Sequence, residues 1–289
     1  MNLEGIIIKG IGGFYYVKTE KGEVCECKAR GVFRKDNIKP AIGDKVTIEE
    51  ENGKGSIVKI HERRTFMVRP PVSNIDNLLI VTAAKNPDPD LLLIDKMIVT
   101  AEYKGITPIL CINKTDLSDG AEVTDIYKNT GYTVLTVSTY ENRGIDRLQE
   151  LLKGKITAFA GPSGVGKSSI LNELISENAE TGEISKKIKR GKHTTRHVEL
   201  FELEKGGYIF DTPGFSSFEL ENIPANELFR LFPEMRDVEG RCRFKGCVHK
   251  NEPDCAVKEM LKNNEISNSR YENYLSIYDI LKARKDWEL

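Results

Sequence analysis

Residues 161–169 read Gly-Pro-Ser-Gly-Val-Gly-Lys-Ser-Ser and could bind the phosphates of a nucleotide. Gly161 and Gly166 frame a loop whose backbone N–H groups can surround phosphates at the start of a helix. Lys167 would lie against the β- and γ-phosphates, and the Ser168 hydroxyl would ligate Mg²⁺. The other predicted contacts of this loop are Pro162, Ser163, Gly164, Val165 and Ser169. The sequence therefore predicts a phosphate loop that works with magnesium.

A second group, Asn113-Lys114-Thr115-Asp116, follows a run of apolar residues and could select a guanine base. The Asp116 carboxylate would accept hydrogen bonds from the N1–H and the exocyclic amine of guanine, a pair of donors that adenine lacks. Asn113 would hold the base edge and its loop, and the Lys114 stem would cover the face of the base. On its own, an N-K-x-D group can also be an ordinary surface turn after a strand.

Two further residues, Ser138 and Thr139, follow another apolar run and resemble the short S-A-x box of GTPases. The backbone N–H groups of that box contact the guanine oxygen. Thr139 stands where the box usually has alanine. We expect both residues to belong to the base-binding half of the site.

The magnesium and γ-phosphate contacts are expected downstream of the loop. Asp211 ends a predicted strand and would hold Mg²⁺ through water, while the Gly214 N–H would contact the γ-phosphate. Thr194 and Thr195 are candidates for the switch threonine that closes over Mg²⁺, and Thr195 is preferred. His193 beside them could position the attacking water, although a polar loop histidine is the more ordinary interpretation.

The order of these groups is unusual. In an ordinary GTPase the phosphate loop comes first, D-x-x-G follows and N-K-x-D comes last. Here Asn113–Asp116 precedes the phosphate loop, so the chain resembles a circularly permuted GTPase. Phe215 stands where Ras-like enzymes carry the glutamine that orients the attacking water. We therefore expect slow intrinsic hydrolysis that needs a partner.

Cys242, Cys247, His249 and Cys255 form a C-x4-C-x-H-x5-C pattern that could bind zinc. Three thiolates and one imidazole fill a tetrahedral site without an open position, so such a site is structural rather than catalytic. The alternative is that these are unrelated residues in a polar loop. Cations near the pattern could contact phosphates or could be solvated charges: Arg241, Arg243, Lys245 and Lys250.

Residues 1–70 are expected to form a small five-stranded barrel of the OB type. Its strands would be Gly5–Lys9, Phe14–Val17, Val24–Lys28, Lys45–Ile48 and Gly55–Ile60. An RNA-binding interpretation has aromatic residues stacking on bases and cations holding phosphates: Phe14, Tyr15, Tyr16, Lys28, Arg30, Arg34 and Lys35. A structural interpretation is also possible, in which every second aromatic residue belongs to the core and the charged side chains are solvated. This segment alone favours the structural interpretation.

After Pro70-Pro71, residues 71–221 alternate between apolar runs and helical patterns, which predicts an α/β domain with a doubly wound parallel sheet. Its strands would be Asn77–Thr82, Ile109–Ile112, Val134–Val137, Ile156–Ala160 and Gly207–Phe210. One helix would start at Asp88-Pro89 and another would span Gly144–Leu152. Every nucleotide-binding group falls at the carboxyl end of a strand, where such sheets bind ligands.

Residues 222–289 are expected to form a helical zinc-binding domain. Its helices would be Ala225–Phe232, Asp254–Leu261 and Ser269–Trp287.

The composition excludes several classes of protein. Charged residues make up 30% of the 289 residues but the net charge is -1, so any nucleic-acid surface must be a local patch. No apolar run approaches the roughly 18 residues of a membrane span, and the start of the chain lacks the pattern of a signal peptide. We expect a cytoplasmic monomer that does not bind membranes.

Taken together, the barrel, the permuted GTPase and the zinc pattern resemble one family over nearly the whole chain, the bacterial ribosome small-subunit-dependent GTPase A family. The resemblance implies a late assembly factor of the small ribosomal subunit. Such a protein would bind the subunit and its ribosomal RNA, and would hydrolyse GTP slowly alone and faster on the subunit. The implied cofactors are one structural zinc ion, and magnesium with GTP.

Three other functions stay open at this point. A nucleotide kinase has a similar phosphate loop but leaves Asn113–Asp116 unexplained. A non-catalytic RNA-binding scaffold, with GTP only as a ligand, is compatible with Phe215. A GTPase that acts on translating ribosomes is the nearest alternative.

Overall fold

The computed structural model describes residues 2–31, 33, 38–51, 54–68, 71–175, 198–211, 220 and 223–284. The chain forms two compact units. The first unit comprises Met1–Leu78, Asp146–Phe159 and Ser168–Phe215, and the second comprises Leu79–Ile145, Ala160–Lys167 and Ser216–Leu289. Each unit is thus assembled from three separate segments of chain.

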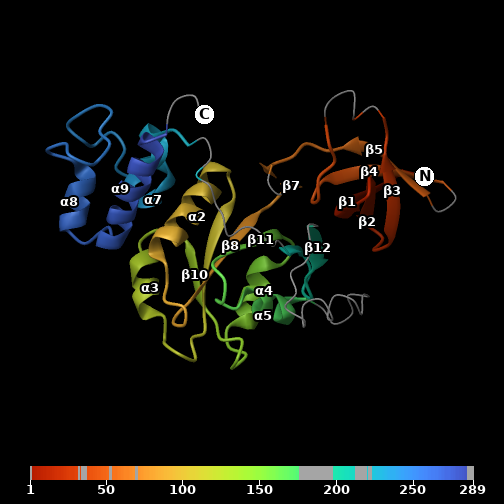
Figure 1. Cartoon of the computed structure of the whole chain (residues 1–289), viewed down its shortest axis with the longest axis horizontal. Coiled ribbons are helices and arrows are strands. Elements are labelled where there is room, and N and C mark those ends of the chain that lie inside the picture. Colours follow the sequence, from red (N-terminus) through yellow and green to blue (C-terminus); the bar gives the residue numbers. More distant parts are fainter. Residues whose placement is uncertain are drawn as a thin grey trace. The chain divides into compact units, whose positions relative to one another are not determined.

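Five strands of the first unit close into the predicted barrel, drawn in red and orange in Figure 1. They are β1 (Asn2–Ile11), β2 (Phe14–Thr19), β3 (Val24–Ala29), β4 (Lys45–Glu51) and β5 (Lys54–Ile60). Their order is β1-β2-β3-β5-β4, and β4 pairs back with β1. Gly12 and Gly13 make the two-residue turn between β1 and β2, and both have a positive φ (+59° and +86°), as the primed hairpin turns require.

The barrel core is mainly aliphatic. Its buried members are Ile7, Val17, Cys27, Phe33, Val46, Ile48 and Ile57. From the aromatic run Phe14-Tyr15-Tyr16, Tyr15 packs partly against this core. Phe14 and Tyr16 are half-buried and have polar neighbours, since the Lys28 amine lies 4.7 Å from the Phe14 ring centroid and the Tyr16 hydroxyl donates to Glu26 at 3.0 Å.

Three more strands of the first unit continue from the barrel: β11 (Ile156–Ala160), β12 (Glu199–Glu202) and β13 (Tyr208–Asp211). β11 and β13 are parallel, and β12 is antiparallel to both β13 and β1. Lys9 of β1 pairs with Glu199 of β12 at 3.0 Å. The helices α4 (Ile145–Leu152) and α5 (Lys167–Leu174) flank β11 in sequence, and β6 (Phe66–Met67) pairs with β7 (Val72–Ser73).

The second unit contains β8 (Asn77–Ala83) from Leu79 onward, together with β9 (Thr107–Asn113) and β10 (Thr133–Thr136), in the order β10-β9-β8. Its first two helices are α2 (Leu91–Tyr103) and α3 (Ala121–Tyr127). β9 and β10 are parallel, and every residue of β8 is buried, as the continuous apolar run predicts. The predicted start of the first helix at Asp88-Pro89 is wrong. The Asp90 carboxylate accepts from the Leu93 N–H at 2.9 Å, so Asp90 is the N-cap and α2 begins at Leu91.

The C-terminal part of this unit contains η1 (Ala225–Leu231), α7 (Pro233–Arg236), α8 (Ala256–Lys262) and α9 (Asn268–Lys282). η1 is a 3₁₀ helix and coincides with the helix predicted at Ala225–Phe232. No helix in the described part of the chain is long and apolar enough to cross a membrane.

A buried ion cluster joins α9 to α2 and α7. Arg270 of α9 is fully buried and donates to both carboxylate oxygens of Glu234, at 2.8 and 3.0 Å. It also pairs with Asp95 of α2, which accepts from Tyr127 at 2.8 Å and from Asn273 at 2.7 Å. Each carboxylate thus accepts hydrogen bonds from the same guanidinium, and this single cation is shared between the two acidic groups.

Replacing Arg270 by Met is expected to lower the free energy of unfolding by about 3–5 kcal/mol, because two buried carboxylates lose their cation. The matched control is Arg243→Met, which breaks an exposed 2.7 Å pair with Asp254 and should cost less than about 1 kcal/mol. Urea denaturation of both variants measures the difference. Equal effects would mean that the cluster does not stabilise α9.

Candidate functional site

Two glycines of the phosphate loop are required by close contacts. Gly161 has a φ of +137°, and a Cβ there would lie 2.1 Å from the carbonyl oxygen of Val81. Gly166 has a φ of +94°, and its Cβ would lie 2.2 Å from Nδ2 of Asn113. The backbone therefore approaches β8 and the end of β9 too closely for any side chain at these positions.

The base-selecting group and the phosphate loop meet directly. Asn113 is the last residue of β9, is 1% exposed and donates from Nδ2 to the carbonyl oxygen of Val165 at 2.9 Å. Its Oδ1 is buried and has no hydrogen-bond partner among the described residues. The Asn113 amide nitrogen thus holds the phosphate loop, and the amide oxygen is left as an acceptor.

Lys167 folds back over the phosphate loop. Its amine donates to the carbonyl oxygens of Gly161 and Pro162 at 2.8 and 2.6 Å, and burial lowers the pKa of the amine below its ordinary value. A phosphate group in the loop would favour the charged form of this amine. Ser168 and Ser169 are exposed in the first turn of α5, so the Ser168 hydroxyl is accessible as a magnesium ligand.

The base-binding half is held by hydrogen bonds among its own residues. The Ser138 hydroxyl donates to Oδ1 of Asp116 at 2.7 Å and is fully buried. The Thr115 hydroxyl donates to the carbonyl oxygen of Val137 at 2.9 Å, which ties the group to the chain just after β10. Lys114 has a φ of +62° and its amine donates to the Asn86 carbonyl oxygen. Thr139 is half-buried beside Ser138.

Of the remaining predicted residues, the structure describes only Asp211. Asp211 is the last residue of β13, where the predicted strand was expected to end. His193, Thr194, Thr195, Gly214 and Phe215 lie outside the described residues. Their assignments to magnesium, the γ-phosphate and the attacking water therefore stay predictions.

Replacing Gly166 by Ala is expected to destabilise the nucleotide-free protein by roughly 3 kcal/mol, since the new methyl group displaces the Asn113 amide and a buried hydrogen bond is lost. Gly164→Ala is the control. Gly164 also has a positive φ (+82°), but the atom nearest to a Cβ added there is 3.9 Å away. The Gly164→Ala substitution should therefore cost only the backbone strain, about 1–2 kcal/mol. Thermal unfolding without nucleotide measures both. A smaller effect at Gly166 would contradict the contact with Asn113.

The four predicted zinc ligands converge. Their ligand atoms all lie within 4.8 Å of one another, with Nδ1 of His249 at 3.6 Å from Cys242, 3.5 Å from Cys247 and 3.3 Å from Cys255. The Sγ atoms of Cys242 and Cys255 are 3.9 Å apart. A tetrahedron with Zn–S bonds of about 2.3 Å and a Zn–N bond of about 2.0 Å has edges of about 3.5–3.8 Å. The donor set and spacing therefore fit zinc.

The loop that carries these ligands is held by neighbouring side chains. The Glu252 carboxylate accepts from three backbone N–H groups, those of Val248, Lys250 and Asn251, at 2.9–3.0 Å. The hydroxyls of Tyr274 and Tyr271 in α9 donate to the carbonyl oxygens of Val248 and His249, both at 2.7 Å. The sequence gives no obvious signal for these contacts, because they depend on how α9 packs against the loop.

Burial shifts the pKa values of three of these ligands in opposite senses for metal binding. It raises the pKa values of the Cys247 and Cys255 thiols and lowers that of His249. The imidazole is therefore neutral near pH 7, which is the form that binds metal, while the thiols must lose protons when zinc binds.

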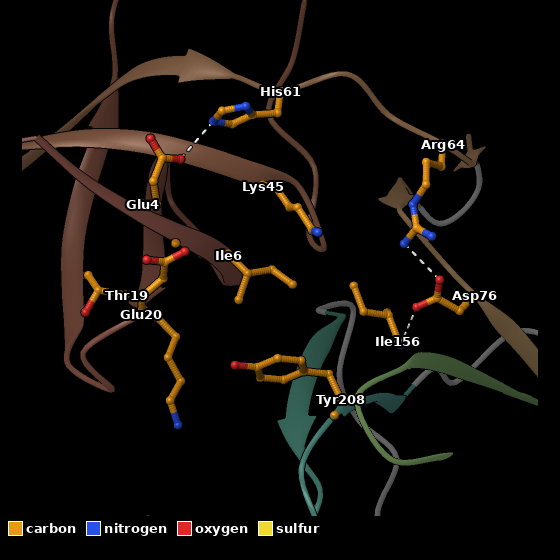
Figure 2. Close-up of a pocket in the computed structure, with 14 residues that line it drawn as sticks. Glu4, Ile6, Thr19, Glu20, Lys45, His61, Arg64, Asp76, Ile156 and Tyr208 are labelled. Atoms are coloured by element: carbon orange, nitrogen blue, oxygen red, sulfur yellow. Dashed lines mark hydrogen bonds and ion pairs between the residues drawn. The ribbon is translucent and has the colours of Figure 1, made fainter. Parts of the chain in front are cut away.

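A separate cavity of about 410 Å³ lies in the first unit, between the barrel and the starts of β11 and β13. Figure 2 shows Lys45 and Tyr208 reaching into it from opposite sides. Its other charged groups mostly pair with each other, as His61 does with Glu4 at 2.9 Å and Arg64 with Asp76 at 2.8 Å. None of the predicted site residues lines it, so it is not the nucleotide site.

Two family models match consecutive parts of the chain. Residues 60–221 match the family model described as RsgA GTPase, and residues 4–58 match the RsgA N-terminal domain. A protein of Ruminiclostridium cellulolyticum, named Small ribosomal subunit biogenesis GTPase RsgA, is 51% identical over 285 residues, covering 96% of this chain and 93% of that protein. A Clostridium perfringens protein of the same name is 46% identical over 287 residues, covering 98% and 99%.

Solved structures agree with the fold. The crystal structure of YjeQ from Thermotoga maritima matches with a TM-score of 0.85 and 36% identity over 99% of this chain and 100% of that one. The crystal structure of YloQ, described as a circularly permuted GTPase, matches with a TM-score of 0.84 and 37% identity over 99% and 96%. These matches support the permuted order that the sequence indicates.

Proposed function

The chain belongs to the RsgA GTPase family, and on that premise we propose that it hydrolyses GTP while assisting the biogenesis of the small ribosomal subunit. In this proposal the protein binds the subunit and its ribosomal RNA in the cytoplasm at a late stage of maturation. Hydrolysis is slow in the free protein, is accelerated by the subunit and leads to release. The names of its relatives, which identify small-subunit biogenesis GTPases, support the choice of subunit.

The observation that carries the GTPase assignment is the 2.9 Å hydrogen bond from Asn113 to Val165. It joins the group that would select guanine to the loop that would hold the phosphates, although the order of the two in the chain is reversed. A nucleotide kinase needs no N-K-x-D group at this place. The same contact therefore favours a GTPase over a nucleotide kinase.

The proposed roles follow from the chemistry of each side chain. Lys167 would leave its two carbonyl acceptors and neutralise the β- and γ-phosphates, while loop N–H groups hold their oxygens. Ser168, Asp211 and Thr195 would hold Mg²⁺, which supplies charge stabilisation at the phosphates when bound. The Gly214 N–H would contact the γ-phosphate.

Hydrolysis would be coupled to RNA binding through β12. The proposed switch threonine, Thr195, lies just upstream of β12, which pairs with β1 of the barrel through Lys9 and Glu199. A change at the switch can therefore reach the barrel through one strand. Downstream of Gly214, the chain continues into the zinc-binding segment.

Two measurements test this proposal. Incubation with GTP should give only GDP and free phosphate, and transfer of phosphate to a small acceptor would point to the kinase instead. Binding to small subunits should be tighter with a non-hydrolysable GTP analogue than with GDP. Equal affinity in the two nucleotide states would contradict the coupling and favour a scaffold for which GTP is only a ligand.

A further inference from the structure

A cavity of about 370 Å³ lies beside the zinc cluster, between η1 and the loop that carries the first zinc ligands. Phe229 of η1 and Phe244 of the loop contribute aromatic rings to its lining. Phe244 is 45% exposed, which makes it one of the more exposed large apolar side chains in the described part of the chain. The cavity is thus a partly open space beside an exposed aromatic ring, which has the Arg243 guanidinium 5.5 Å from its centroid on one side.

Unpaired positive charge lies at this cavity. Lys245 lines it, Arg241 is close in sequence, and both are exposed. Within the described residues neither side chain has an ion-pair partner, whereas Arg243 pairs with Asp254 and Lys250 with Asp279. The cations that remain available are therefore on the loop beside the cavity.

The lining also offers a hydrogen-bond acceptor. His249 lines the cavity and is 3% exposed. Its Nδ1 faces the three cysteines and its Nε2 is buried, so His249 closes the floor of the cavity and offers no accessible donor there. Glu227 adds a carboxylate acceptor.

We propose that this cavity receives one unstacked base of single-stranded RNA, an inference that rests on the proposed function and names a contact for its RNA partner. The base stacks on Phe244, and Lys245 and Arg241 hold the flanking phosphates. Glu227 supplies an acceptor for the base edge. Two unpaired cations beside an aromatic face fit a phosphate backbone better than they fit an apolar or basic peptide.

The test uses the full zinc-loaded chain and a single-stranded RNA of mixed sequence that carries one 4-thiouridine. After irradiation, mass spectrometry should find the cross-link on the peptide that contains Phe244 and Lys245. Phe244→Ala should remove this cross-link and weaken RNA binding by about tenfold, and Phe244→Trp should retain both. Lys245→Ala should weaken binding in a salt-dependent way, whereas Lys262→Ala on α8 should not.

Tyr103→Ala is the matched aromatic control because Tyr103 is 40% exposed on α2 and does not line the cavity. Each variant must keep its bound zinc. Cross-links confined to other peptides, unchanged RNA affinity of Phe244→Ala, or binding of an acidic peptide in place of RNA would overturn the assignment.

Subunit-stimulated GTP hydrolysis is measured in parallel. Stimulation without a cross-link here overturns only this inference, and a cross-link without stimulation overturns only the proposed function.

Discussion

Replacing Asp116 by Asn is expected to shift nucleotide preference from GTP to xanthosine triphosphate. The carboxylate can accept from both donors of guanine, but an amide presents one acceptor and one donor. Xanthine carries a carbonyl where guanine carries the amine, so it matches the amide. Ser138 donates to Oδ1 of Asp116 at 2.7 Å and would hold the amide oxygen of Asn in place, leaving its NH₂ for the base.

The affinity for GTP should fall by roughly 10³-fold, because a hydrogen-bonding site that must leave a polar group unpaired rejects its ligand strongly. Competition between labelled GTP and unlabelled xanthosine triphosphate measures the shift. Asp119→Asn is the control, since the Asp119 carboxylate caps the Ala121 N–H at 3.0 Å nearby. If Asp116→Asn kept its preference for GTP, the guanine-selecting role of Asn113–Asp116 would be wrong.

Replacing Cys255 by Ser is expected to unfold the loop that holds the zinc ligands while leaving α9 folded. The loop has few apolar residues, and the binding energy of a structural zinc ion, about 10–16 kcal/mol in small zinc domains, becomes folding energy. α9 should survive because Arg270 and the apolar residues around Tyr274 hold it independently against α2 and α7.

Zinc content and hydrogen exchange measure this effect. The unmodified protein should hold one zinc ion per chain, and Cys255→Ser should lose most of it together with the protection of residues 241–255. Cys25→Ser in the barrel is the control and should keep the zinc. Loss of protection throughout α9 would show that the zinc ion, rather than the buried ion cluster, holds the C-terminal helices.

Much of the site could be predicted because its chemistry depends on short groups at fixed spacing. Glycines at 161 and 166, the N-K-x-D group and the zinc pattern each need particular residue types in a particular order, and the structure places Asn113 against Val165 and His249 against three cysteines. The five barrel strands were also predictable, since their apolar residues are interrupted by clear turn residues.

Features that depend on distant packing could not be predicted. β12 is only four residues long and is defined by its neighbours β1 and β13 rather than by its own pattern. The start of α2 was misplaced because Asp88-Pro89 and Asp90 all resemble helix starts, and the hydrogen bond to Leu93 decides between them. Arg270 is recognisable in the sequence as a charged residue among the apolar positions of a helix. Its partners could not be predicted, because they lie on α2 and α7.

The most direct test of the account is the rate of GTP hydrolysis with and without purified small ribosomal subunits. We expect slow hydrolysis by the protein alone, a large increase with small subunits, and no increase with large subunits. That result would explain why Phe215 stands where other GTPases carry a water-orienting glutamine. An unchanged rate with small subunits would contradict the proposal that the subunit triggers hydrolysis.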